Sequence, residues 1–265
     1  MTTASAPTRD RHGSSRRMGI WRLEWLRLTR TPRLVALLGV FVFFGLLGPV
    51  TATYLPDIVA NVQSGMTIIV PPPQPRDGII NYVSQAGQIG LIVLVAISAG
   101  AMGFDSRPGL SIFLRSRVGS MWQLVRPRII VVAAAGIVAY GAGLLSAWFE
   151  TAVLLGPLDP AALLAGLFCQ AVYLLFVVAV VTAAASLARS TPAILGIALG
   201  SVIALSVIGG LGLLHDWLPT TLAGAQVALL GTTTLVDYLP AIAASLIATA
   251  ALIAAGVHRL ARRET

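Results

Sequence analysis

The sequence predicts an all-α membrane protein in which six helices cross the bilayer. Of its 265 residues, 57% are hydrophobic and only 11% are charged, and the mean hydropathy is +0.87. The apolar residues form long runs, which are separated by shorter stretches that contain arginine, glycine and proline. This composition is typical of a polytopic membrane protein, and it excludes a water-soluble globular domain.

The length of the apolar runs gives the number of spans. A membrane-spanning helix needs about 20 mostly apolar residues, because inside lipid every backbone N–H and C=O must find its partner within the helix. Six stretches meet this requirement, at 34–54, 84–104, 129–148, 161–188, 192–214 and 239–257. The fourth and fifth are separated only by "ARSTP", which predicts a tight turn between them.

The arginines predict the orientation of the chain. All 18 basic residues are arginine, and with the N-terminus inside every one except Arg76 falls on the same side of the membrane. Most of the 10 acidic residues fall on the other side. Positive charge in short loops stays on the cytoplasmic side of the membrane. We therefore expect both termini in the cytoplasm and the chain in the cell membrane of a bacterium. The basic charge thus serves topology and faces anionic lipid headgroups, and it needs no nucleic acid partner.

The N-terminal region divides into two parts. Residues 1–17 are polar and lack periodicity, which predicts a disordered cytoplasmic tail before a single membrane domain at 18–265. The next stretch favours a helix, in which Trp21, Trp25 and Leu28 fall on one stripe. Such a stripe predicts a helix that lies in the membrane plane and packs against the spans. The alternative is a plain anchor, with tryptophan at the headgroups and arginine reaching toward water.

The stretch at 104–128 carries charge into an otherwise apolar chain. If it is helical from Gly109, its apolar residues recur every three or four positions, at Leu110, Leu114, Val118, Met121 and Val125. Asp105 or Ser106 is suited to capping the start, and Gly119 with Ser120 to breaking the helix midway. The apolar stripe fits either a helix on the lipid surface or a docking surface, and the spacing does not choose between them.

Chemical motifs are mostly absent from the sequence. A phosphate-binding Walker A loop requires a lysine, and this chain has none. Its three histidines, His12, His215 and His258, are far apart, and Cys169 has no second cysteine to pair with. We therefore expect no catalytic residue, no metal site and no cofactor in this chain, which is not predicted to be an enzyme.

Three uncharged polar residues lie within predicted spans, at Gln85, Gln88 and Gln170. They are candidates for lining a substrate path, and hydrogen bonds between helices are an equal alternative. Glu150 follows the end of the third span and is expected at the interface. The apolar segment 222–230 is too short to cross, so it is expected either to re-enter the membrane or to lie at its outer surface.

The order of these features resembles the permease subunits of type-two ATP-binding-cassette exporters. The resemblance covers about residues 18–260 and depends on "WRLEWLRLTRTPR" before the first span and on "FDSRPGLSIFLRSRV" after the second. The acid of the second motif is Asp105 where the family usually has Glu, and Pro108 before the glycine is also less typical.

The resemblance implies a pair of permeases driven by two separate cytoplasmic ATPase subunits, which bind the ATP and magnesium. It implies a coupling helix that contacts the ATPase through Asp105, Gly109, Leu110, Leu114 and Val118. It also implies an elbow helix, formed by the segment of Trp21, Trp25 and Leu28. The predicted function is the transmembrane subunit of an export complex, for a substrate that the sequence does not identify. Two alternatives are an ion-coupled secondary transporter and a membrane anchor or assembly factor without transport.

Overall fold

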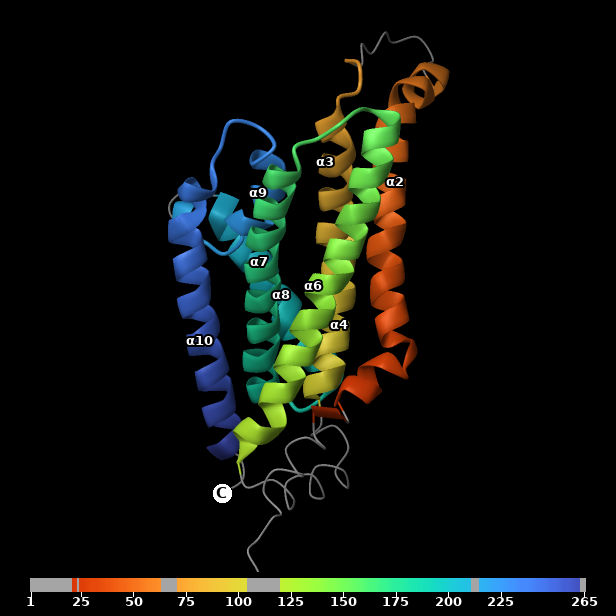
Figure 1. The fold of residues 1–265 in the computed structure, drawn as a ribbon. Helices are drawn as coiled ribbons and strands as arrows, with labels where there is room; N and C mark the ends of the chain where they lie inside the picture. The colour runs from red at the N-terminus through yellow and green to blue at the C-terminus, as the bar shows by residue number, and fades with distance from the viewer. Residues whose placement is uncertain (1–20, 23, 63–70, 104–119, 211–214, 263–265) are drawn as a thin grey trace, which may run out of the picture.

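The chain folds into an upright bundle of long helices (Figure 1). The structure is a computed structural model, and it describes residues 21–22, 24–62, 71–103, 120–210 and 215–262. Among these residues six helical segments are long and apolar enough to cross a membrane, and no strand occurs. The predicted all-α fold with six spans is therefore confirmed.

The spans follow one another along the chain. They are α2 (Pro32–Val62), a second span built from α3 (Pro75–Gln85), the π-helical turn η1 (Ala86–Gly90) and α4 (Leu91–Met102), then α6 (Met121–Leu154), α7 (Pro160–Leu187), α8 (Thr191–Gly210) and α10 (Leu239–Arg262). Three shorter helices precede α10, namely η3 (His215–Trp217), α9 (Thr221–Ala228) and η4 (Leu235–Tyr238).

The second and third spans begin earlier than the sequence predicts. The second begins at Pro75 rather than at residue 84, because Pro75 and a capping box between Gln74 and Asp77 start the helix among polar residues. The third begins at Met121 rather than at residue 129. Met121 and Val125 are both buried in the bundle. They therefore belong to the span, and the prediction that they continue the apolar stripe of a separate 109–125 helix is wrong.

One end of the bundle gathers the arginines. The start of α2, the end of α4, the start of α6 and the end of α10 all lie at this end, whereas α9 lies at the other (Figure 1). We call it the arginine-rich end; its described arginines are Arg22, Arg27, Arg30, Arg33, Arg126, Arg128, Arg189, Arg259 and Arg262. Arg76 lies at the opposite end, near the start of α3. The helices thus have the arrangement that the charge-based topology requires.

The segment at 222–230 does not cross the bundle. It contains α9, which is 8 residues long and buries Leu222, Ala225 and Gln226. The Gln226 side-chain amide donates a hydrogen bond to the Leu163 carbonyl oxygen of α7 at 3.2 Å. This short helix is thus docked on α7 at the end of the bundle opposite the arginines.

Candidate functional site: the joint at the arginine-rich end

A short helix precedes the first span. Residues 21–22 and 24–29 are helical, and a bend at Arg30 and Thr31 separates them from α2. Of the predicted apolar stripe only Leu28 is buried, with 6% of its surface exposed, whereas Trp25 is 55% exposed. Trp21 is also exposed. The N-terminal helix therefore packs on the bundle through Leu28, while its tryptophans lie on the outer surface, where headgroups would surround them.

Next to Leu28, the N-terminal helix makes a buried ion pair with the third span. The Glu24 Oε1 atom lies 2.8 Å from the Arg128 Nε atom, and the two side chains are only 12% and 2% exposed. The Arg128 Nη1 atom also donates to the Ala101 carbonyl oxygen, at 3.2 Å. We call Glu24, Ala101 and Arg128 the N-terminal joint. It fastens three elements together: the N-terminal helix, the end of α4 and the start of α6.

The N-terminal joint lies beside two helices that are consecutive spans of the chain. Residues 104–119 follow the end of α4 and precede the start of α6 in the sequence. The joint holds both of these ends to the N-terminal helix. The end of α4 is also in close contact with α8, because a Cβ added to Gly103 would lie 2.7 Å from the Thr191 hydroxyl oxygen. The end of α4 therefore contacts the N-terminal helix, α6 and α8.

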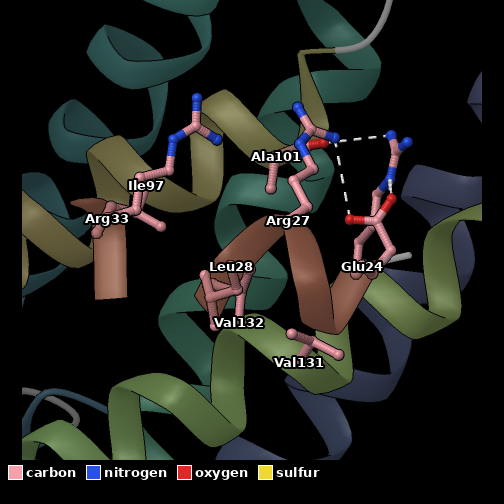
Figure 2. A pocket seen from close by; sticks show the side chains of 9 residues that line it. Glu24, Arg27, Leu28, Arg33, Ile97, Ala101, Val131 and Val132 are labelled. Carbon is pink, nitrogen blue, oxygen red and sulfur yellow. Dashed lines mark hydrogen bonds and ion pairs between the residues drawn. The ribbon is translucent and has the colours of Figure 1, made fainter. Parts of the chain in front are cut away.

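A cleft opens beside the joint, between the N-terminal helix and the spans (Figure 2). We call it the cationic cleft; it is lined by Glu24, Arg27, Leu28, Arg33, Ile97, Ala101, Arg128, Val131 and Val132. Three guanidinium groups and one carboxylate surround it, so it carries an excess of positive charge. The Arg27 side chain is 39% exposed, and its Nη1 atom lies 3.9 Å from the Glu24 Oε2 atom. That contact is much weaker than the buried pair with Arg128.

The predicted coupling residues lie elsewhere in the chain. Asp105, Gly109, Leu110, Leu114 and Val118 all fall within 104–119, outside the described residues. Their role in contacting a partner stays a prediction.

The predicted substrate-path residues differ in burial. Gln170 on α7 is buried, and its Oε1 atom has no hydrogen-bond partner within the described parts of the chain. Gln85 is half-buried at the end of α3, and Gln88 is exposed within the π turn. The π turn was not predicted; such turns interrupt regular helices and are frequent at functional sites. The role of these three residues in a substrate path stays a prediction.

Sequence reasoning did not identify Glu24 and Arg128 as a pair. Glu24 is one of two acidic residues among the arginines that precede the first span, the other being Asp10, and Arg128 directly precedes the predicted start of the third. Their contact, however, joins positions 104 residues apart, and nothing in a single sequence links them.

The comparisons with known proteins support the membrane assignment. The chain is 24% identical over 208 residues to the "Uncharacterized transmembrane protein YxlG" of Bacillus subtilis (strain 168), which covers 76% of this chain and 80% of that protein. No protein-family model matches the sequence, and no solved structure matches it. Together with the six apolar helices, this similarity identifies the chain as a multi-pass membrane protein.

Proposed function

We propose that the chain is the transmembrane subunit of an ATP-driven export complex and that it works with separate cytoplasmic ATPase subunits. The observation that carries this proposal is the N-terminal joint. It fixes the N-terminal helix to both ends of segment 104–119 through the 2.8 Å contact between Glu24 and Arg128 and the hydrogen bond to Ala101. This segment is where the resemblance expects the ATPase to dock.

The joint supports the proposal because coupling needs stiffness. An ATPase can bias two arrangements of the spans only if the segment it binds is connected to them by contacts that transmit the bias. A buried ion pair with a short charge-assisted hydrogen bond is specific in geometry. Truncating one partner would leave the other charge buried without compensation, so the pair resists small distortions. A helix that only anchored the chain in lipid would not need such a contact.

The energy source belongs to the partner in this proposal. A chain without lysine has no Walker A loop, so ATP and magnesium would bind to the ATPase subunits, two in each complex with two permease copies. We expect the purified chain to neither bind nor hydrolyse ATP. Nucleotide hydrolysis by a preparation shown to be free of other subunits would contradict this expectation.

Copurification tests the proposal. The tagged chain is co-expressed with each ATP-binding-cassette ATPase of the same genome in turn, and the ATPase recovered per permease is measured. Leu114→Asp removes an apolar contact worth about 1.5 to 3 kcal/mol and adds a charge, so it should lower recovery by at least about tenfold.

The matched control is Arg115→Ala, because Arg115 lies off the predicted apolar stripe. An exposed charge contributes about 0 to 1 kcal/mol, so this variant should retain its partner. Both variants are compared at equal membrane levels. If Leu114→Asp recovers as much ATPase as the unmodified chain, segment 104–119 is not the docking site and the proposed coupling is wrong.

The π turn is the one observation that favours the ion-coupled alternative. Secondary transporters bind their substrates at interrupted helices near the middle of the membrane, and η1 interrupts the second span at Ala86–Gly90. Reconstituted vesicles separate the two functions. Uptake driven by an ion gradient with the permease alone would favour the secondary transporter, and uptake that requires the ATPase and ATP would favour the export complex.

A further inference from the structure

We propose that the cationic cleft binds the phosphate of an anionic phospholipid from the membrane leaflet at the arginine-rich end. This inference does not depend on export, because it concerns only how the chain sits in its bilayer. It starts from two properties of the cleft: an excess of positive charge among its lining residues, and a position beside the exposed tryptophans of the N-terminal helix.

The described carboxylates do not neutralise all of the positive charge that lines the cleft. Arg128 is engaged by Glu24 and by the Ala101 carbonyl oxygen, and the Arg27 contact with the same carboxylate is long, at 3.9 Å. Arg33 makes no ion pair with any carboxylate of the described residues. Among the described residues, the Glu24 carboxylate contacts Arg27 and Arg128 but not Arg33. Guanidinium groups are well suited to phosphate, because their planar fork donates two parallel hydrogen bonds.

Two of these guanidinium groups extend in the same direction from the cleft. Figure 2 shows Arg27 and Arg33 extending to the same side, away from Leu28, Val131 and Val132. Arg33 crosses over α4, where a Cβ added to Gly100 would lie 3.8 Å from its Nη1 atom. The guanidinium group therefore lies within van der Waals reach of α4 at position 100. Arg27 belongs to the N-terminal helix and Arg33 to α2, so a phosphate bound to both would bridge the bend between them.

The level of the cleft favours a lipid over a soluble anion. The N-terminal helix beside the cleft exposes Trp21 and Trp25, and tryptophan favours the membrane–water interface, where phospholipid headgroups lie. Leu28, Val131 and Val132 line the cleft but are buried in the bundle, so the arginines would bind the headgroup phosphate and not the acyl chains. A free phosphate would not be concentrated at this level.

A titration of the purified, detergent-solubilised chain tests the site. Short-chain phosphatidylglycerol, short-chain phosphatidylcholine and inorganic phosphate are added separately, and an apparent dissociation constant is taken from the rise in melting temperature with ligand concentration. We expect phosphatidylglycerol to stabilise the chain at concentrations where the other two do not. Equal stabilisation by phosphatidylcholine would show that only the apolar part binds and would overturn the proposal. Equal stabilisation by inorganic phosphate would show a soluble-anion site and would overturn the lipid assignment.

Three variants locate the binding. Arg33→Gln removes one charge-assisted contact and should weaken phosphatidylglycerol binding about tenfold. Arg33→Lys keeps the charge and should recover most of the affinity. Arg30→Gln is the matched control, because Arg30 is exposed at the same bend and lies outside the cleft; it should change the affinity less than about twofold. If Arg30→Gln and Arg33→Gln weaken binding equally, the effect is general surface charge and the proposed site does not exist.

Discussion

The middle of the bundle and its arginine-rich end are held together in different ways. In the middle, α2 and α6 cross with their backbones in contact: a Cβ added to Gly45 would overlap the Gly143 carbonyl oxygen. The Tyr82 hydroxyl donates to the Tyr140 carbonyl oxygen at 2.7 Å in the same region. At the arginine-rich end, the N-terminal helix is held by the ion pair of Glu24 and Arg128. Close backbone packing holds the middle of the bundle together, and an ion pair holds the N-terminal helix at the arginine-rich end.

This difference indicates which region can move. Small residues let membrane helices approach closely, and such packing has no second arrangement of similar energy once the backbones touch. A joint made of one ion pair and one hydrogen bond is discrete, and it can open and close again as a unit. The middle is therefore expected to act as a scaffold for α2 and α6. The arginine-rich end is the place where a partner could shift the balance.

The largest expected effect comes from filling the glycine contact. Gly45→Leu places a side chain where the Gly143 backbone lies, so the free energy of unfolding should fall by more than about 4 kcal/mol. The variant should be lost from the membrane or elute as aggregate in detergent. Gly39→Leu is the control on the same helix, because nothing lies within 4 Å of a Cβ at Gly39. A normal melting temperature for Gly45→Leu would show that the helices do not cross as described.

The second-largest expected effect distinguishes the buried ion pair of Glu24 and Arg128 from the more exposed contact between Glu24 and Arg27. Glu24→Ala leaves Arg128, which is 2% exposed, without its carboxylate. The free energy of unfolding should then fall by about 2 to 3 kcal/mol. The matched variant Arg27→Ala removes a partner of the same carboxylate that is 39% exposed and 3.9 Å away, and it should cost about 0 to 1 kcal/mol. Thermal unfolding in detergent measures both, and equal losses would contradict the distinction.

The smallest expected change in stability belongs to the proposed substrate path. Gln170 is buried, and its Oε1 atom has no partner among the described residues. Gln170→Leu keeps most of the volume and should therefore change the free energy of unfolding by less than about 1 kcal/mol. If Gln170 lines a path, export should change while the melting temperature does not. A clear loss of stability would assign the residue to helix packing instead.

The six spans were predictable because each one satisfies its backbone hydrogen bonds locally and must be apolar throughout its length. The residues at which the spans begin were harder to predict. Arg76 and Asp77 hide the first turns of α3 from any search for apolar runs, although a proline and a capping box begin the helix there. In the third span, Met121 and Val125 repeat with the same spacing as the preceding segment. The apolar spacing therefore continues across Ser120, where the structure begins the third span.

The candidate site was only partly predictable. Leu28 was expected to pack and does so, but the same stripe also contained Trp21 and Trp25, which are exposed. Periodicity identifies an apolar face without saying whether protein or lipid covers it. The partner of Glu24 lies in another helix. Contacts between helices depend on how the bundle assembles, and a single sequence holds no record of that assembly.

The central claim is that the N-terminal joint supports the docking of an ATPase and does not only hold the fold. The most direct test is a double-mutant cycle with Glu24→Gln, Arg128→Gln and the double variant, in which ATPase recovery per permease is measured at matched membrane levels. If the two residues act as one joint, each single variant should lower recovery about fivefold, and the double variant should lower it little further. If recovery is unchanged in all three while their melting temperatures fall, the joint is structural alone and the proposed coupling is contradicted.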